Sequence, residues 1–386
     1  MRRTTTPPTA DSRSLIPMDA AEPFTDVHRI VVLRAGGLGD LLFTVPALHA
    51  LHESYPQASI EILGAPVAAL LEGRLPFPVT TRRLPPVAGV TAPPDRPTDV
   101  SDFVATITQQ PIDLAVQLHG GGRFSNPFLL SLGARHTVGC ATDDADALER
   151  TLPYRFYQHE VARDLEVVGL AGALTMMREP RLAPLDEDLA RADQALGITA
   201  EGHSPLVVLH PGATDPRRRW PVGNFAQLAS ALAREGAQVA VIGDRSEQEL
   251  AEAVVREAEA RGGSAGRSPV VSLAGRLGLG GLTGLLARAD LVVANDSGPR
   301  HLADALGTAT CSVYWCGNVI TAGPQTRLRH RIRIAWVTSC PVCGVDVTQV
   351  GWTAQRCPHD PSFVASVGVD AVLEDARSLL GSGVAH

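Results

Sequence analysis

The segment Leu291-Val-Val-Ala-Asn-Asp-Ser-Gly-Pro-Arg-His-Leu-Ala-Asp-Ala-Leu306 combines a strand, a polar turn and the start of a helix in one short stretch. Its first three apolar residues are typical of a parallel strand that is buried on both faces. Asp296, Ser297 and Gly298 end the strand, and Pro299 suits the first helical position, where a missing N–H is tolerated. The helix start presents free backbone N–H groups, which favour an anion such as phosphate. The segment therefore predicts an α/β fold with a ligand at this strand end.

Two ionisable residues flank that helix start, Asp296 and His301. Both are candidates for binding the ligand. A simpler interpretation is also open, because Asp296 and Ser297 are common helix caps and His301 would then be a solvated residue of the first turn. The segment by itself does not decide between these two roles.

A second strand, turn and helix pattern lies near the N-terminus. The apolar run from Ile30 to Leu33 precedes a turn that contains Gly36, Gly37, Gly39 and Asp40. The glycines allow a close approach to the backbone, but the third glycine of the dinucleotide fingerprint is missing, and no Gly-Lys pair forms a Walker loop. A carboxylate at a helix start stays ionised, so we predict Asp40 to be a general base; the alternative is that it only caps its helix.

Strand and helix patterns alternate along two series of similar size that are joined by a linker. This alternation predicts an α/β protein with two doubly wound Rossmann-like domains that face each other across a cleft. The pattern is lost at residues 75–97 and 141–153, which are predicted as irregular loops. The predicted division is a disordered tail (1–26), a first domain (27–185), a linker region (186–204), a second domain (205–365) and a C-terminal helix and tail (366–386).

The composition narrows the function. The 386-residue chain is 45% hydrophobic, 19% charged and has a net charge of −7, which argues against a nucleic-acid partner. It contains no lysine, so a Schiff base or a P-loop lysine is excluded, and phosphate must be bound by arginine, backbone N–H or hydroxyl groups. No signal peptide and no membrane-spanning run is predicted, which leaves peripheral membrane contact possible and makes the cytoplasm the expected location.

The loop that follows the strand at Leu206 carries three adjacent arginines, residues 217–219. Together with Thr214 they could clamp a diphosphate, since a guanidinium binds phosphate oxygens in pairs. Arg218 is the candidate that we retain, and a solvated basic loop is the alternative. After the next strand, Glu247 could accept hydrogen bonds from ribose hydroxyls, or it could be an ordinary carboxylate in a first helical turn.

A cysteine cluster lies near the C-terminus. Cys340-Pro-Val-Cys343 has the spacing of a zinc ligand pair, and Cys357 and His359 follow. The histidine is closer to Cys357 than in the usual zinc finger, so a structural metal at these four residues remains open. We assign no metal and no cofactor to catalysis.

Four segments together resemble glycosyltransferase family 9, the heptosyltransferase family, from Ile30 to about Leu380. They are Gly-Gly-Leu-Gly-Asp40-Leu-Leu-Phe-Thr-Val-Pro-Ala-Leu48, His210-Pro-Gly-Ala with Arg-Arg-Trp-Pro221, Ile242-Gly-Asp-Arg-Ser-Glu247 and Asn295-Asp-Ser-Gly-Pro-Arg-His301. The resemblance implies a GT-B fold, an inverting mechanism without a catalytic metal, and an ADP-activated heptose as donor.

The resemblance also implies roles for particular residues. The family's presumed base matches Asp40, and its donor-binding block matches Asp296, Ser297, Gly298 and His301. Where the family often has lysine two residues before Trp-Pro, this chain has arginine, at position 218, which retains the charge and changes the geometry.

The sequence therefore predicts an inverting, metal-independent glycosyltransferase that moves a sugar, a heptose by resemblance, from an ADP-activated donor to a hydroxyl. The acceptor is a glycan, a glycolipid or a small molecule. The predicted donor-binding residues are Thr214, Arg218, Glu247, Asp296, Ser297, Gly298 and His301. The alternatives are a nucleotide-sugar epimerase with the same twin-domain cleft and a non-catalytic sugar-nucleotide-binding module, while an NAD oxidoreductase is the weakest choice.

Overall fold

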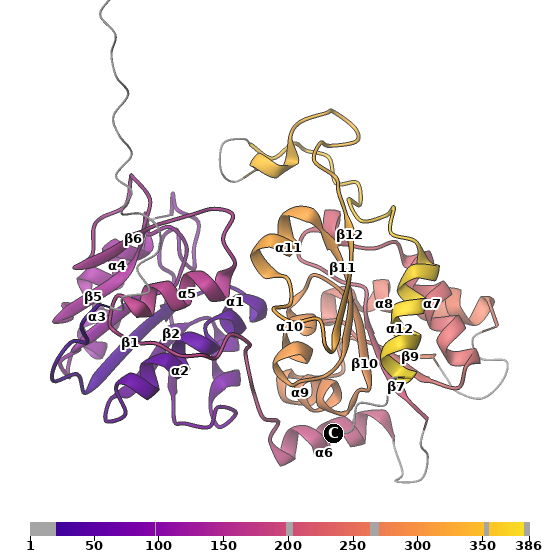
Figure 1. Cartoon of the computed structure of the whole chain (residues 1–386), viewed down its shortest axis with the longest axis horizontal. Helices are drawn as coiled ribbons and strands as arrows, with labels where there is room; N and C mark the ends of the chain where they lie inside the picture. The colour runs from indigo at the N-terminus through magenta and orange to yellow at the C-terminus, as the bar shows by residue number, and fades with distance from the viewer. Residues whose placement is uncertain (1–20, 97, 198–203, 263–269, 351–354, 382–386) are drawn as a thin grey trace, which may run out of the picture.

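The computed structural model of the chain describes residues 21–96, 98–197, 204–262, 270–350 and 355–381. Its first half is built on one parallel sheet (Figure 1). In chain order, this half contains β1 (Arg29–Arg34), α1 (Leu38–Phe43), α2 (Val45–Ser54), β2 (Ser59–Gly64), the 3-10 helix η1 (Pro66–Leu71), β3 (Thr80–Arg83), α3 (Ser101–Ile107), β4 (Leu114–Gln117), α4 (Ser125–Ser131), β5 (His136–Ala141), β6 (Arg150–Pro153) and α5 (Glu160–Gly169).

The second half is built on another parallel sheet and begins with α6 (Asp186–Leu196). Its further elements are β7 (Leu206–His210), η2 (Pro216–Arg218), α7 (Val222–Arg234), β8 (Gln238–Val241), η3 (Arg245–Glu247), α8 (Gln248–Ala260), β9 (Val270–Ser272), α9 (Leu279–Arg288), β10 (Leu291–Asn295), α10 (Gly298–Ala305), β11 (Thr310–Trp315), α11 (Cys316–Ala322), β12 (His330–Ala335), η4 (Val347–Gln349) and α12 (Val369–Gly381).

The two sheets have the same topology. The strand orders are β3-β2-β1-β4-β5-β6 and β12-β11-β10-β7-β8-β9, and the first strand of each half pairs in parallel with the second and the fourth. Each is thus the 3-2-1-4-5-6 order of a doubly wound sheet, which binds ligands where the strand order reverses. The reversal falls between β1 and β4 in the first half and between β7 and β10 in the second. The prediction of an α/β fold with two doubly wound halves is confirmed.

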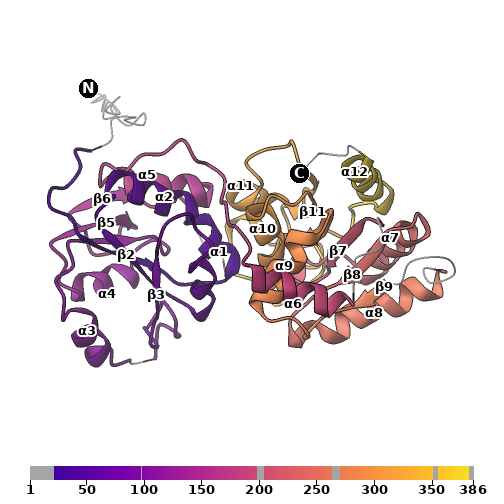
Figure 2. The same ribbon diagram turned by 90° about the horizontal axis from the view of Figure 1, so that it is seen from below.

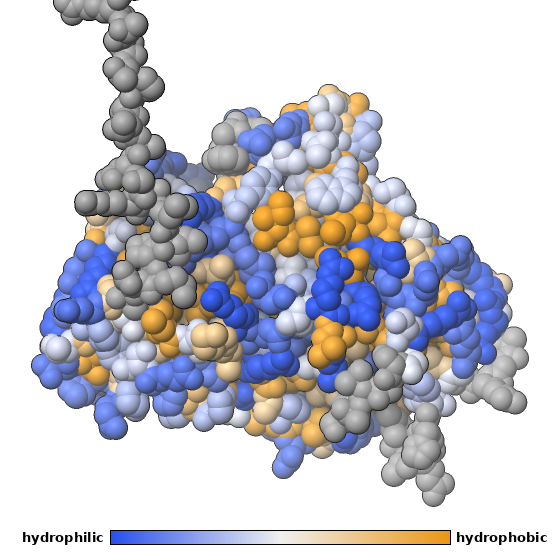
Figure 3. Space-filling model, in the orientation of Figure 1, coloured by the Kyte–Doolittle hydropathy of each residue, from blue (hydrophilic) through white to orange (hydrophobic). Residues whose placement is uncertain are grey.

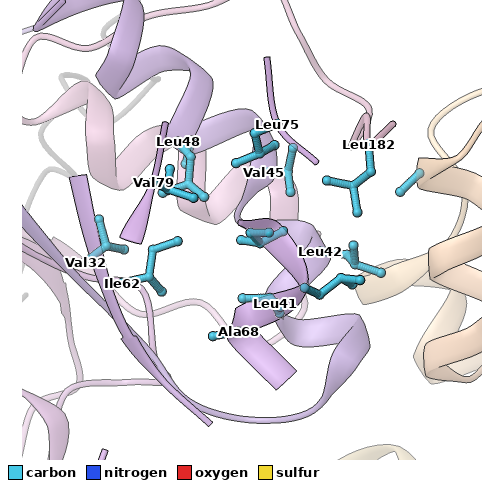
Figure 4. Close-up of a cluster of buried hydrophobic side chains, with 14 of the residues drawn as sticks. Val32, Leu41, Leu42, Val45, Leu48, Ile62, Ala68, Leu75, Val79 and Leu182 are labelled. Atoms are coloured by element: carbon cyan, nitrogen blue, oxygen red, sulfur yellow. The ribbon is translucent and has the colours of Figure 1, made fainter. Parts of the chain in front are cut away.

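The central strands form where the sequence is apolar. All five residues of β10 are buried, as are five of the six residues of β1, because helices cover both faces of each sheet. A continuous hydrophobic cluster extends from the first half to the second. In Figure 4, Leu42 and Leu182 lie on the side of this cluster next to the ribbon of the second half. The two halves therefore share buried apolar contacts at the base of the cleft.

A buried ion pair also joins the halves. Arg74 donates two hydrogen bonds to Asp188 of α6, at 2.8 and 2.7 Å. Helix α6 in turn packs along α9 of the second half (Figure 2). A Cβ at Gly284 would lie 1.9 Å from the Asp188 carbonyl oxygen, so this close contact requires glycine in α9. Residues 186–196 of the predicted linker region are thus a helix that is packed on the second half, and the domain division itself remains a prediction.

Two segments predicted as irregular loops contain edge strands. The stretch 75–97 includes β3 (Thr80–Arg83), and the stretch 141–153 includes β6 (Arg150–Pro153). Each strand is short and pairs on one side only, with β2 and β5 respectively. Such edge strands need no continuous apolar run, because solvent covers much of them. The loop predictions are wrong there for that reason.

The last six residues of the predicted N-terminal tail are ordered. Residues 1–20 lie outside the described residues, but residues 21–26 belong to the first half. The Phe24 ring is buried and stacks on the His136 ring at a centroid distance of 3.9 Å. The Arg150 guanidinium lies 3.8 Å from the centroid of the Phe24 ring. The prediction of disorder is therefore wrong for residues 21–26.

The face seen in Figure 3 is mostly hydrophilic, with a hydrophobic group on the second half below the segment that follows β12. Within the described ranges, no helix is both long and apolar enough to cross a membrane. Helix α12, at the C-terminal end of the described chain, packs on α7, β10 and β11 of the second half.

Candidate functional site

The N-termini of α1 and α10 face each other where the two halves meet (Figure 1). Each helix follows the strand at the point where the order of its sheet reverses. A Cβ at Gly39 would lie 2.9 Å from the His301 ring, and a Cβ at Gly298 would lie 3.0 Å from the Leu38 Cβ. Two of the predicted glycines thus allow the helices of the two halves to approach each other.

A cavity of about 570 Å³ opens between these helix ends. Residues from both halves line it, and they include all but one of the predicted site residues. Those lining residues are Gly37, Gly39, Asp40, Thr214, Arg218, Glu247, Asp296, Ser297, Gly298 and His301. The exception, Gly36, adopts φ +106° and forms the turn that leads into α1. The sequence therefore located the residues of one shared cleft.

Asp40 is the exposed carboxylate of the first half. Its side chain is 51% exposed, and its Oδ2 accepts a hydrogen bond of 2.9 Å from the Gly37 N–H. Its Oδ1 lies 3.5 Å from the Arg34 guanidinium. Asp40 therefore caps α1, as the simpler interpretation predicted, and also presents its carboxylate to the cleft.

A buried charge network supports Arg34. The guanidinium of Arg34 lies 3.4 Å from Glu160 and 3.9 Å from Asp164 on α5. Burial raises the pKa of Asp164 to about 7, although Arg34 opposes this shift. Burial also acts to raise the pKa of Glu160, but the guanidinium groups of Arg34 and Arg163 outweigh it and lower that pKa. Glu160 therefore stays ionised and lines the cleft beside Asp40.

Asp296 has a different environment in the second half. It is only 3% exposed; its Oδ2 accepts a 2.9 Å hydrogen bond from Arg218, and its Oδ1 lies 3.0 Å from His301 Nε2. Burial acts to raise the pKa of Asp296, but the contacts with His301 and Arg218 outweigh burial and lower it. The Asp296 carboxylate thus fixes the positions of the Arg218 and His301 side chains, which both line the cleft.

The two side chains that contact the His301 ring define its tautomer. Arg300 Nη1 lies 3.0 Å from His301 Nδ1, and a guanidinium can only donate. Nδ1 is therefore the acceptor, and Nε2 carries the proton that is donated to Asp296. Arg300 is held in turn by Asp304 at 3.1 Å, which also contacts His330 at 3.0 Å. The ring of His301 is consequently fixed on both sides.

Ser297 is the N-cap residue of α10, but its side chain does not cap the helix. Its Oγ instead lies 2.9 Å from His210 Nδ1, and His210 Nε2 lies 3.2 Å from Glu247. The hydrogen bond with His210 lowers the pKa of Glu247, against the opposing effect of burial. Because no side chain caps the first turn of α10, its N–H groups remain available to an anion.

Only one of the three adjacent arginines lines the cleft between α1 and α10. Arg217 binds Asp215 and lies with its guanidinium 5.2 Å from the centre of the Phe363 ring, while Arg219 donates to the Ala213 carbonyl oxygen at 2.9 Å. The interpretation of a three-arginine clamp is therefore wrong. The 3-10 turn of η2 directs neighbouring side chains to different sides, and of the three arginines only Arg218 contacts Asp296.

Sequence reasoning missed several residues of the site. His210 is the last residue of β7 and lines the cleft, so its place at a strand end could have identified it. Arg34, the last residue of β1, carries the same strand-end signal, whereas Glu160 gave none, because it comes from the start of α5. Their roles depend on packing between distant segments.

Two doubly wound halves that share one cleft at their strand ends are the GT-B fold of glycosyltransferases. The solved glycosyltransferase family 9 structure from Veillonella parvula is 19% identical, with a TM-score of 0.72 over 95% of this chain and 99% of that one. The Escherichia coli ADP-heptose lps heptosyltransferase II is also 19% identical, with a TM-score of 0.70 over 92% of this chain and 100% of that one. Both likenesses show the fold.

The chain belongs to glycosyltransferase family 9 (heptosyltransferase), whose family model matches residues 103–339. It is 24% identical over 297 residues to lipooligosaccharide heptosyltransferase 2 of Haemophilus ducreyi, which corresponds to 72% of this chain and 80% of that relative. The predictions of the family, the GT-B fold and a glycosyltransferase activity are confirmed.

Proposed function

We propose that this glycosyltransferase moves a heptose from ADP-heptose to a hydroxyl of a glycan acceptor by an inverting mechanism that needs no catalytic metal, and that it acts in the cytoplasm. One observation carries the proposal. The exposed carboxylate of Asp40 and the uncapped N-terminus of α10 line the same cleft from opposite halves. One side can accept a proton while the other binds a diphosphate.

The second half offers a site for each part of the donor. Arg218 and the first-turn N–H groups of α10 are cationic or polar donors suited to the diphosphate. Apolar residues after β8 and before and within α9 line the same cavity and suit the flat face of an adenine ring. They are Ile242, Leu277, Leu279 and Leu282. The Escherichia coli neighbour is named for ADP-heptose, which is why we propose this donor.

The reaction follows from these positions. As the acceptor oxygen forms a bond with C1 of the sugar, its proton passes to Asp40. The bond between C1 and the phosphate oxygen breaks with its electron pair going to ADP. Arg218 and the N-terminus of α10 stabilise the negative charge that develops there. Attack and departure on opposite faces of C1 invert its configuration.

Metal independence rests on the same groups. A guanidinium and a helix N-terminus together supply the positive potential that a divalent cation supplies elsewhere. Within the described part of the chain, no group of three or more potential metal ligands gathers in this cleft. We therefore expect the rate of a desalted enzyme to be unchanged by added Mg²⁺ or Mn²⁺.

The identity of the acceptor is proposed mainly from the names of the related proteins. The Haemophilus ducreyi relative is named as a lipooligosaccharide heptosyltransferase. We propose a glycan of this chemical class, and the first half as its binding side, because Asp40 and Glu160 lie there. Peripheral contact with a membrane that holds such a glycolipid is part of this proposal.

The test is an assay with purified ADP-heptose, with and without a core-glycan acceptor. We expect ADP release to depend on the acceptor, and proton NMR of the product to show an anomeric configuration opposite to that of the donor. A retained configuration would contradict the inverting mechanism. A new sugar nucleotide formed from donor alone would instead identify an epimerase, and donor binding without any transfer or hydrolysis would identify a binding module.

The role of Arg218 is tested by calorimetry with ADP. Arg218→Ala should weaken binding by about 10- to 100-fold, the amount expected for a hydrogen bond to a charged group. Arg218→Lys keeps the charge and removes the planar fork of the guanidinium. Its ADP affinity should therefore lie between those of the wild type and Arg218→Ala. An unchanged ADP affinity in both variants would remove Arg218 from the donor site.

A further inference from the structure

Three cysteines and one histidine gather in the segment that follows β12. The sulfur atoms of Cys340, Cys343 and Cys357 and a ring nitrogen of His359 all lie within 4.8 Å of one another. Figure 1 shows this segment as the orange and yellow excursion above the second sheet. None of these residues contributes to the cleft between α1 and α10. The sequence left a metal at this place open, and the structure now places all four side chains together.

The spacing suits one tetrahedral ion. A zinc ion with Zn–S bonds of about 2.3 Å has neighbouring sulfurs about 3.8 Å apart. The Cys340 sulfur lies 3.9 Å from His359 Nδ1. Three thiolates and one imidazole are a common ligand set of structural zinc sites. All the cysteines of the chain are free thiols in the structure, so no disulfide occupies these ligands.

The backbone turns so that the first two sulfurs lie on one side. Cys340 N–H donates to the Val345 carbonyl oxygen, and Gly344 N–H donates to the Cys340 carbonyl oxygen, both at 2.8 Å. Gly344 adopts φ +74°, a left-handed conformation that glycine allows without strain. This tight turn after Cys343 returns the chain toward the second ligand pair. The arrangement is formed by the backbone and does not depend on the side chains alone.

The segment has little regular structure and a small core of its own. In the described part of residues 336–363, the regular structure consists of η4 and one isolated bridge between Ser339 and Asp346. Its separate hydrophobic cluster has three buried members, Cys340, Val347 and Phe363. So small a core does not offset the entropy of ordering a segment of this length. A bound metal would supply the missing free energy.

This segment also forms part of the active-site region. It contributes to a second cavity of about 380 Å³, which continues from the first because both include Glu160 and Arg218. Thr348 and Phe363 line one side of it, and Tyr154 and Tyr157 of the first half line the other. The Tyr157 hydroxyl donates a hydrogen bond to the Thr348 carbonyl oxygen across this space.

The same segment supports the arginine loop. Ser362 Oγ donates to the Arg219 carbonyl oxygen at 2.6 Å, and Phe363 N–H donates to the Arg217 carbonyl oxygen at 2.7 Å. Both acceptors flank Arg218 in the chain. The segment that carries the cysteine cluster therefore contacts the cleft through these hydrogen bonds to the arginine loop. The cluster residues themselves do not line the donor cleft.

We propose that Cys340, Cys343, Cys357 and His359 bind one Zn²⁺ ion, and that this ion holds the described residues 336–350 and 355–363 in place as the outer wall of the acceptor side of the cleft. The metal assignment stands on the ligand geometry alone. Its effect on the acceptor rests on the proposed function, since the second cavity is assigned to the acceptor only by its position beside Asp40 and Glu160.

Metal content is the first measurement. The full chain, purified without chelators, should contain one zinc ion per molecule by plasma mass spectrometry. Cys343→Ser and Cys357→Ser should each lose the zinc and melt several degrees lower, while the matched control Cys316→Ser, whose sulfur lies outside the cluster, should retain it. Zinc chloride added to the metal-depleted wild-type chain should restore its melting temperature, and it should not restore that of Cys343→Ser.

Kinetics then test the wall. Cys343→Ser should raise KM for the acceptor several-fold and leave the dissociation constant of ADP nearly unchanged, because no cluster residue lines the donor cleft. An equal loss of ADP affinity would overturn the acceptor-side role. If no acceptor activity is found at all, the metal content and the melting temperatures still test the zinc site.

Three results would overturn the zinc site. They are a chain that is fully folded and active with less than stoichiometric metal, a disulfide between Cys340 and Cys343 in the purified chain, and zinc retained by both cysteine variants. Iron bound at the same stoichiometry would overturn the choice of zinc, since a tetrahedral thiolate-rich site also accepts iron.

Discussion

Asp40 and Asp296 both lie at the start of a helix that follows a strand beside the reversal of its sheet, which is β1 in the first half and β10 in the second. Asp40 is half exposed and makes its closest hydrogen bond with the backbone of its own turn. Asp296 is buried and holds Arg218 and His301, which come from two different segments. The same strand, turn and helix pattern thus gives an exposed carboxylate in one half and a buried one in the other.

The difference follows from what covers each turn. In the second half, the loop after β7 lies over the end of β10 and brings Arg218 to the carboxylate. In the first half, the corresponding cation is Arg34, which comes from the strand itself and lies beneath Asp40 at 3.5 Å. One carboxylate is therefore enclosed from above, and the other stays open to the cleft. A doubly wound fold can be given either role by the loop that covers the turn.

The largest expected effect is the loss of turnover in Asp40→Asn. Removing a general base reduces rates by about 10²–10⁴-fold. Since the side chain is half exposed, the melting temperature and the ADP affinity should change little. Turnover and ADP calorimetry on the same preparation check this. An Asp40→Asn enzyme that retains full turnover would show that the carboxylate is only a helix cap.

Asp296→Ala should show the opposite pattern. It leaves Arg218 and His301 without their shared partner in a buried site, which costs about 3–5 kcal/mol. We expect a large fall in the free energy of unfolding together with weaker ADP binding. Asp296→Asn, which preserves the shape, is the second variant if the first does not fold, and it should show smaller changes in the same direction. Normal stability and ADP affinity in Asp296→Asn would contradict the structural role.

Gly39→Ala tests the close approach of the two helices. The added methyl would lie 2.9 Å from the ring of His301, which cannot move because Asp296 and Arg300 hold it. Overpacking of this kind costs about 1–3 kcal/mol. Thermal melting and kcat/KM should both fall, whereas the control Gly169→Ala, where nothing lies within 4 Å, should melt like the wild type. Equal behaviour of the two variants would show that the halves do not need this contact.

Two further expected effects concern the dependence of stability on pH. The pKa of Asp164 is raised from 3.8 to about 7, so in this window the folded chain keeps a proton that the unfolded chain releases. Stability from this group therefore falls as the pH rises through the window and is constant above it. The melting temperature of Asp164→Asn should exceed that of the wild type by an amount that grows as the pH rises from about 4 to about 7. A constant difference would contradict the raised pKa.

Asp296 should act on the other side of that window. Its pKa is lowered from 3.8, so its contribution to stability is present above that value and is lost as the pH falls below it. Melting curves of the wild type in acid, compared with those of Asp296→Asn, should converge as the pH decreases. The two halves would then lose stability at opposite ends of the pH range.

The sequence predicted the strand ends of both halves well, because buried strands such as β10 have uninterrupted apolar runs and polar turns follow them. Thr214, Glu247 and Ser297 were located by that rule. The edge strands β3 and β6 escaped it, since strands open to solvent on one side carry polar residues such as Arg82 and Thr151. A local run of apolar residues indicates a buried strand, and these two strands are only partly buried.

Side-chain direction was the other limit. Nothing in the run of residues 217–219 indicates that its first arginine turns to Asp215 and its last to a backbone carbonyl. Nor does the sequence bring Glu160 to Arg34, which are separated by most of the first half. Both facts depend on which distant segments pack together, and hydrophobic periodicity carries no such information.

The opposed starts of α1 and α10 have one more consequence under the proposed mechanism. Before transfer, the negative charge of Asp40 lies at the N-terminus of α1; afterwards Asp40 is protonated, and the departing ADP has gained one unit of negative charge at the N-terminus of α10. The reaction thus moves one charge from the positive end of one helix dipole to that of another. The total charge of the cleft is the same before and after, so the cleft has no net charge to exchange with solvent during the chemical step.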